Sequence, residues 1–124
     1  MILVDTSVWV DHLRRGEPTL VQALQSSLAL CHPFVIGELA CGDLRGRVDV
    51  LAALGALPQT PIATQAEALA FLHRHKLYGR GIGWIDIHLL ASTVLAAGSS
   101  LWTRDKRLGM VATDLGLNYQ EEIK

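Results

Sequence analysis

The stretch Ile2-Leu3-Val4-Asp5-Thr6-Ser7-Val8-Trp9 decides the fold, because it joins a short strand directly to a helix. Residues 2–4 are apolar and β-prone, which is typical of a buried strand. Residues 5–7 are all good helix N-caps, so a helix starts there, and Gly16 ends it. We expect one face of this helix to hold the residues Thr6, Trp9, Val10 and Leu13.

The same alternation of strand and helix continues along the chain. Further strands are predicted at residues 28–31 and 100–103, with weaker ones within 57–62 and at 118–119. Further helices are predicted over residues 18–27, 33–41, 48–57, 64–77, 84–97 and 105–115. Parallel strands joined through helices need right-handed crossovers, which cover both faces of the sheet. We therefore predict one α/β domain over residues 1–124, with a short central parallel sheet between helices.

The composition is that of a single globular domain. The chain has 124 residues, of which 50% are hydrophobic and 19% are charged, so it can bury a core and is not disordered. Eleven basic residues balance twelve acidic ones to a net charge of −1. This balance excludes a globally basic coat for nucleic acid, although it allows a local basic patch.

The sequence predicts a cytoplasmic protein without membrane attachment. Cys31 and Cys41 form no CxxC pair, and we expect both to be buried packing residues in a reducing compartment. The first residues lack the cationic segment and apolar run of a secretory signal. The longest apolar stretch, residues 89–97, is far shorter than the ~20 residues that span a bilayer.

Four acidic residues occur in surroundings that are otherwise apolar. Asp5 and Asp105 each follow a predicted strand and precede a helix, so both belong to the edge where ligands bind in α/β sheets. Glu38 and Asp86 interrupt apolar helix faces. Charges beside so much apolar surface are costly unless they are paired or bind a cation. A set of oxygen donors favours Mg²⁺ or Mn²⁺.

Structural explanations remain open for three of these acids. Asp5, Asp86 and Asp105 each stand where a helix begins and could serve only as caps. Glu38 has no such explanation, because it lies in the middle of a predicted helix. We assign other acids to surface pairs, caps or the polar tail: Asp11 with Arg15, Glu67 with Thr64, and Glu121 and Glu122.

Four segments of the chain resemble a known family. They are residues 2–9, Gly37-Glu38-Leu39, residues 81–92 (GIGWIDIHLLAS) and residues 101–108 (LWTRDKRL). In this order and spacing they are similar to the PIN-domain nucleases, and more closely to the VapC-type toxins of prokaryotic toxin–antitoxin pairs. The resemblance covers nearly the whole chain and implies the PIN-like three-layer sandwich.

The resemblance also implies a function. It makes Asp5, Glu38, Asp86 and Asp105 the acidic site, with Thr6 and Thr103 as supporting hydroxyls. The implied activity is that of a metal-dependent endoribonuclease, in which Mg²⁺ or Mn²⁺ activates water to hydrolyse RNA phosphodiester bonds. Asp5 and Asp86 are the first candidates for direct ligands, then Asp105, and Glu38 binds directly or through water. The implied partners are RNA, a small antitoxin protein and a second copy of the chain.

The chain departs from the family pattern at two positions. Ile87 and His88 follow the third acid, where PIN sequences often have alanine, and Leu108 stands where an aromatic residue is common. On an ideal helix His88 points away from Asp86, so we predict a surface or hydrogen-bonded histidine without a catalytic role. Leu108 is a packing difference.

Basic residues near these acids are candidates for contacts with RNA phosphates. No carboxylate occurs between residues 68 and 85, and basic residues flank Asp105. Such contacts would position a strand without reading its sequence. The alternative is an ordinary solvated helix face. The candidates are Arg74, Lys76, Arg80, Arg104, Lys106 and Arg107.

Two other functions remain open from the residues alone. One is a catalytically silent PIN-like module that binds RNA or protein, with residues 20–28 and 48–57 as partner surfaces. The other is a receiver-type phosphoacceptor domain, which also uses strand-end aspartates and Mg²⁺. Receiver domains usually show an acidic pair near the N-terminus, whereas here Thr6 and Ser7 follow Asp5.

Overall fold

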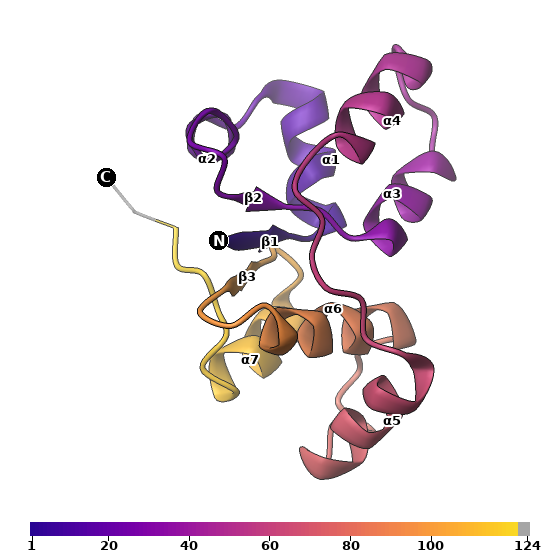
Figure 1. The fold of residues 1–124 in the computed structure, drawn as a ribbon, viewed down its shortest axis with the longest axis vertical. Coiled ribbons are helices and arrows are strands. Elements are labelled where there is room, and N and C mark those ends of the chain that lie inside the picture. The colour runs from indigo at the N-terminus through magenta and orange to yellow at the C-terminus, as the bar shows by residue number, and fades with distance from the viewer. Residues whose placement is uncertain (122–124) are drawn as a thin grey trace.

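The computed structural model describes residues 1–121, and its centre is a three-stranded parallel sheet (Figure 1). The first strand, β1 (Ile2–Val4), lies in the middle, between β2 (Ala29–Leu30) and β3 (Ser100–Trp102). Leu3 of β1 pairs with Leu30 on one side and with Leu101 on the other. Because the strands are parallel, their carboxyl ends meet at one edge of the sheet.

Helices cover both faces of this sheet. In Figure 1, α1 to α4 lie on one side and α6 and α7 on the other, while α5 packs against α6. This layering confirms the predicted α/β sandwich. The helices are α1 (Thr6–Arg15), α2 (Pro18–Gln25), α3 (Pro33–Ala40), α4 (Arg47–Gly55), α5 (Gln65–Arg74), α6 (Trp84–Leu95) and α7 (Lys106–Asp114).

Two segments extend the sheet by single bridges. Cys31 pairs with Gln59, and Leu101 pairs with Asn118, each in a parallel bridge. The weak strands predicted at 57–62 and 118–119 are therefore present only as isolated pairs. Prolines on both sides of Gln59, at 58 and 61, lack the N–H groups that a longer ladder would need.

The helix predicted to run to residue 77 ends at Arg74. Lys76 adopts the left-handed conformation with φ 53°, and the Leu77 amide donates to the Leu72 carbonyl at 3.0 Å. This bond is the one that closes a Schellman helix end, and Leu77 is then buried. The helix therefore stops before Gly79, the glycine expected to end it.

The buried face of α1 differs from the predicted one. Val8 and Trp9 are buried in the core, whereas Val10 and Leu13 are 39% and 40% exposed. α1 packs beside α3, and Val10 and Leu13 line a groove between these two helices. The apolar residues of α1 thus face two surfaces, the core and the groove. The helical period alone does not show which of these residues are buried.

One of the two cysteines also differs from the prediction. Cys31 is buried, but Cys41 is exposed. Cys41 follows the last residue of α3, where residues 41–43 form an exposed stretch of chain. The expectation of two buried cysteines was therefore wrong for Cys41, because it lies beyond the covered part of its helix.

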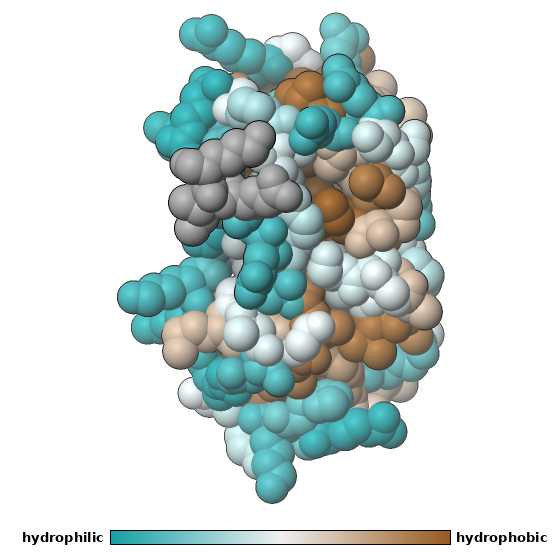
Figure 2. Space-filling view, turned by 90° about the vertical axis from the view of Figure 1, so that its left-hand side faces the viewer, coloured by the Kyte–Doolittle hydropathy of each residue, from teal (hydrophilic) through white to brown (hydrophobic). Residues whose placement is uncertain are grey.

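The surface is mixed in character. On the face shown in Figure 2, apolar residues form separate patches between hydrophilic side chains. Large apolar side chains that are well exposed include Val48, Ile62 and Met110. Within residues 1–121, every helix is too short or too polar to cross a bilayer.

Candidate acidic active site

Asp5 directly follows β1 and is held by hydroxyl groups from two chain segments. Its side chain is buried, and its Oδ2 accepts hydrogen bonds from Ser7 Oγ at 2.7 Å and from Thr103 Oγ1 at 2.8 Å. Thr103 follows β3, the strand beside β1, so the sheet itself brings Thr103 to Asp5. These donors fix the carboxylate and offset part of the cost of burying its charge.

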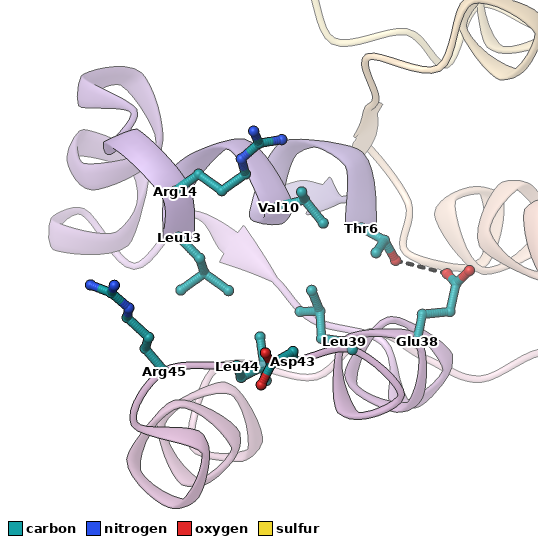
Figure 3. Close-up of a pocket in the computed structure, with 10 residues that line it drawn as sticks. Thr6, Val10, Leu13, Arg14, Glu38, Leu39, Asp43, Leu44 and Arg45 are labelled. Carbon is teal, nitrogen blue, oxygen red and sulfur yellow. Dashed lines mark hydrogen bonds between the residues drawn. The ribbon is translucent and has the colours of Figure 1, made fainter.

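Glu38 reaches from α3 to the start of α1. The Thr6 hydroxyl donates to Glu38 Oε1 at 2.7 Å (Figure 3). Thr6 is the first residue of α1 and the neighbour of Asp5. The acid in the middle of a helix, which has no capping role, therefore has a tertiary partner at the same edge of the sheet as Asp5.

Asp86 lies in the first turn of α6 and is influenced by the other three acids. Burial raises the pKa of Asp86 above its ordinary value. A hydrogen bond from the Gly83 amide to Oδ2, at 3.0 Å, lowers this pKa, and the charges of Asp5, Asp105 and Glu38 raise it again. Asp86 is thus within electrostatic reach of the other three predicted carboxylates.

Asp105 precedes α7 and caps this helix. Its Oδ1 accepts a hydrogen bond from the Leu108 amide at 3.0 Å, and its own amide donates to Thr103 Oγ1 at 3.0 Å. The Thr103 hydroxyl therefore contacts both strand-end acids, because it donates to Asp5 and accepts from the backbone of Asp105.

Each of the four carboxylates uses only one oxygen in these bonds. No hydrogen-bond donor within residues 1–121 contacts the second oxygen of Asp5, Glu38, Asp86 or Asp105. A capping bond on one oxygen leaves the other available, so the capping explanation for three of these acids does not exclude a ligand role.

The donor chemistry fits a hard divalent cation, because free carboxylate oxygens are what Mg²⁺ and Mn²⁺ bind. In the described part of the chain, no three His, Cys, Asp or Glu side chains are grouped tightly enough to hold a metal ion. Mg²⁺ does not need such a cage, since it commonly takes one or two protein carboxylates and keeps several waters.

Ser7 is a member of this site that was not predicted. Its hydroxyl donates to Asp5, accepts from the Arg104 amide at 2.9 Å and lies 3.3 Å from Thr103 Oγ1. A serine two residues after an N-cap acid can reach back to that acid, and this spacing was the available signal.

Arg104 is occupied by carboxylates. Its guanidinium donates to Asp11 at 2.8 Å, to Glu17 at 2.7 and 3.0 Å, and to Glu121 at 3.0 Å. These ion pairs argue against the predicted contact of Arg104 with RNA phosphate. The partners come from distant parts of the chain, so the pattern around Asp105 gave no indication of them.

Two acids that were assigned to the surface or the tail, Asp11 and Glu121, therefore also pair with Arg104. Asp11 pairs with Arg15 at 3.4 Å as predicted, but its contact with Arg104 is shorter. Glu121 accepts from Arg104 and from the indole N–H of Trp102. Glu122 lies outside the described residues.

Lys106 and Arg107 are exposed in the first turn of α7, next to Asp105. Neither contacts a carboxylate among residues 1–121. A Cβ on Gly81 would lie 2.7 Å from Arg107 Nη1, so the Arg107 side chain crosses the loop that leads into α6. Among residues 1–121, an arginine without a carboxylate partner therefore lies between the start of α7, beside Asp105, and the loop leading to α6, which carries Asp86.

The other three basic candidates are in different settings. Arg80 pairs with Asp114 at 2.8 Å, and Lys76 is exposed at the end of α5. Arg74 lines a hollow with Val94 of α6, about 12 Å along that helix from Asp86. The structure does not bring Arg74 to the four acids.

Two buried histidines lie beside the site. The rings of Phe34 and Trp84 contact His88 at centroid distances of 4.9 and 4.7 Å, and no donor or acceptor contacts His88 Nδ1 within residues 1–121. The prediction of a surface or hydrogen-bonded histidine was wrong, because α6 is buried from Ile87 to Thr93.

His32 was not predicted to have a role, and it caps α3. Its Nδ1 accepts a hydrogen bond from the Phe34 amide at 3.0 Å, and burial lowers the pKa of His32 to about 4, with a smaller contribution from His88. The signal for this cap was Pro33, since proline favours the first helical position and so marks the preceding residue as the N-cap.

A groove begins at the contact between Thr6 and Glu38 and runs between α1 and α3 (Figure 3). Its floor is apolar and its rim carries charged side chains of both signs. The floor consists of Val10, Leu13, Leu39 and Leu44, and the rim includes Arg14, Asp43 and Arg45.

Known proteins are similar to this chain over nearly its full length. The PIN domain family model matches residues 2–113, which sets aside the receiver-type alternative. Two curated proteins named Ribonuclease VapC32, from Mycobacterium tuberculosis strains CDC 1551 / Oshkosh and ATCC 25618 / H37Rv, are each 47% identical over 123 residues. The match covers 99% of this chain and 99% of each relative. The chain therefore belongs to the PIN domain family, in its VapC group.

Proposed function

We propose that this protein is a metal-dependent endoribonuclease and the toxin of a toxin–antitoxin pair. The observation that carries the proposal is the set of four acids, each of which has one oxygen in a hydrogen bond and one oxygen without a donor among residues 1–121. Membership of the PIN domain family and similarity to two proteins named as ribonucleases support the same activity.

The acids have different tasks in this proposal. Asp5 and Asp86 bind the metal, Asp105 assists them, and Glu38 binds it directly or through water. Mg²⁺ or Mn²⁺ in this position would polarise a phosphodiester oxygen and make water a better nucleophile. The Thr103 hydroxyl holds Asp5 in a fixed orientation, and the Thr6 hydroxyl does the same for Glu38. No side-chain nucleophile is required.

RNA would approach along the edge that carries Lys106 and Arg107. These side chains are exposed beside Asp105 and have no carboxylate partner within residues 1–121. Cations at this position offset the repulsion between RNA phosphates and the acids. Lys76 and Arg80 would extend the contact, with Arg80 first exchanging its pair with Asp114.

The proposed antitoxin would bind the groove between α1 and α3. An apolar segment fits the floor, and charged residues can pair with Arg14 and Arg45 at the rim. Because the groove ends at Glu38, a cation on that segment would reach the acids and neutralise them.

We also propose that two copies of the chain associate and cover exposed apolar residues such as Val48. We further propose that the protein acts on RNA in the cytoplasm.

The test is cleavage of RNA by purified protein. Asp5→Asn and Asp86→Asn should each lose cleavage in Mg²⁺ while remaining folded, because they remove metal-binding charge rather than core packing. Asp49→Asn is the matched control, since Asp49 is an exposed acid on α4, and it should cleave like the wild type. Cleavage by Asp86→Asn at the wild-type rate would contradict the site. Failure of the wild type to cleave any RNA would favour the silent interaction module.

A further inference from the structure

Arg104 joins three separate parts of the described chain through its side chain. Nη1 and Nη2 form a bidentate pair with Glu17, which precedes α2, and Nη1 also contacts Asp11 of α1. Nε contacts Glu121 near the end of the described residues. The Arg104 side chain is 24% exposed and that of Glu17 is 14% exposed, so this pair is partly shielded from water, whereas Glu121 is more exposed.

Such a network differs from an ordinary surface ion pair. Single exposed pairs contribute little to stability, because water screens them and ordering two long side chains costs entropy. Bidentate arginine–carboxylate pairs that are partly buried and shared among several acids are stronger and fix geometry. The hydrogen bonds with Arg104 also lower the pKa of Glu17 to about 2, so the pair stays charged at any physiological pH.

The backbone of Arg104 reaches the acidic site. Its amide donates to Ser7 Oγ at 2.9 Å, and Ser7 Oγ donates to Asp5 Oδ2 at 2.7 Å. The residue before Arg104 is Thr103, the other hydroxyl donor to Asp5, and the residue after it is Asp105. A shift of Arg104 would therefore move both hydroxyl partners of the buried acid, together with a second acid.

We propose that Arg104 is a positioning residue of the acidic site. Its guanidinium fixes the turn between β3 and α7 onto the corner between α1 and α2, and this turn holds Asp5 and Asp105 in place. The inference rests on the proposed function, because it assigns these acids to a metal. It also replaces the predicted role of Arg104 as a contact for RNA.

The experiment measures Mn²⁺ affinity by titration calorimetry without RNA, and then kcat and KM for RNA cleavage. Arg104→Gln should weaken Mn²⁺ binding by about tenfold, the loss typical of residues that orient metal ligands, and should lower kcat with little change in KM. Arg107→Gln is the comparison, because it alters an arginine on the other side of Asp105. It should raise KM and leave Mn²⁺ affinity unchanged.

Two milder variants guard against misfolding. Glu17→Gln keeps the shape of the partner but removes its charge, so it should cause a smaller loss of Mn²⁺ affinity. Because both residues act through one pair, the double variant Arg104→Gln/Glu17→Gln should be no worse than Arg104→Gln alone. Arg104→Lys keeps the charge without the bidentate fork and should recover part of the affinity.

The outcomes separate this inference from the proposed function. If Arg104→Gln and Glu17→Gln bind Mn²⁺ as the wild type does, the positioning role is wrong even if the protein cleaves RNA. If Arg104→Gln raises KM alone, Arg104 is a phosphate contact after all. If the wild type binds no Mn²⁺, the proposed function fails, and this inference fails with it.

Discussion

Two regions on either side of Asp105 each contain an arginine, and within residues 1–121 the two arginines differ in whether they pair with carboxylates. At the corner between α1 and α2, the carboxylates of Asp11, Glu17 and Glu121 surround Arg104. At the edge formed by the 79–83 loop and the first turn of α7, Arg107 crosses Gly81 and meets no carboxylate within residues 1–121. The role of an arginine next to an acidic site therefore depends on the groups that its guanidinium contacts. In our proposals, the first region positions the acids of the site and the second contacts RNA.

The largest expected effect concerns the acids between the two regions. Repulsion among four like charges should weaken the metal-free protein, and Mn²⁺ at a hundred times its Kd should add about 2.7 kcal/mol to the free energy of unfolding. Thermal melts of the wild type with chelator and with Mn²⁺ should therefore differ by several degrees.

The matched variant for these melts is Asp5→Asn/Asp86→Asn. It should melt higher than the wild type in chelator and should lose most of the gain from Mn²⁺. A double variant that keeps the metal-dependent shift would mean that these acids do not bind the ion. The regions of Arg104 and Arg107 would then lie beside acids that do not bind a metal.

A next smaller effect is expected at Gly81, which lies under Arg107. Gly81 has φ 78°, so Gly81→Ala should cost about 1–2 kcal/mol of stability from backbone strain. The new Cβ would also displace the Arg107 side chain, so KM for RNA should rise. Gly79→Ala is the control, because Gly79 has φ 72° and open space around it. It should cost similar stability in chemical denaturation and leave KM unchanged. Equal KM values for the two variants would contradict the role of Arg107.

Salt dependence gives a finer distinction between the two arginines. If Arg107 contacts one phosphate of single-stranded RNA, Arg107→Gln should reduce the slope of log Kd against log salt by about 0.7. Arg104→Gln should leave this slope as it is, because its charge is already neutralised by carboxylates. Fluorescence anisotropy with labelled RNA in Ca²⁺ or chelator measures both slopes. A reduced slope for Arg104→Gln would remove the contrast between the regions.

The smallest expected effect is the pH dependence of stability that His32 causes, to which the Arg104 corner should not contribute. His32 has a pKa of about 4 when folded, below its ordinary value of 6.5, so the unfolded chain binds more protons between these values. The stability contributed by neutral His32 is present above pH 6.5 and is lost as pH falls toward 4. The loss should be about 0.8 kcal/mol at pH 6.

His32→Asn keeps a cap for α3 and should reduce this pH dependence, as measured by urea unfolding at pH 7.5 and pH 6. A remainder is expected from His88, because burial lowers the pKa of that histidine as well. The Arg104 corner should not contribute in this range, because the pKa of Glu17 is about 2. An unchanged pH dependence in His32→Asn would place the acid sensitivity in another group.

The fold was predictable because its signals are local. Each of these signals spans only a few neighbouring residues: the strand-to-helix step at Asp5, the proline at the start of α3, and the capping box of Thr64 with Glu67. Helix ends were less accurate. The left-handed Lys76 that stops α5 has no sequence signature comparable to a glycine.

Features that depend on distant contacts were not predictable. Arg104 and its partners Asp11 and Glu17 are 93 and 87 residues apart in sequence, so neither hydropathy nor spacing indicates the pairs. Burial of His88 likewise depends on Phe34 from another helix. Asp5 and Asp105 were identified because each follows a strand, and parallel strands bring such residues to one edge of the sheet. Glu38 and Asp86 were identified because each interrupts an apolar helix face.

The central position of β1 has a consequence for the timing of synthesis. β1 is made first, yet the Thr103 hydroxyl that holds Asp5 is made 98 residues later, roughly 5–20 s at ordinary rates of translation. The groove between α1 and α3 consists of residues 6–45, so all of it is made before Asp86 and Asp105. If the antitoxin binds this groove as proposed, a nascent chain would complete its antitoxin-binding residues before the acids of its nuclease site. The order of the chain would then favour neutralisation before activity.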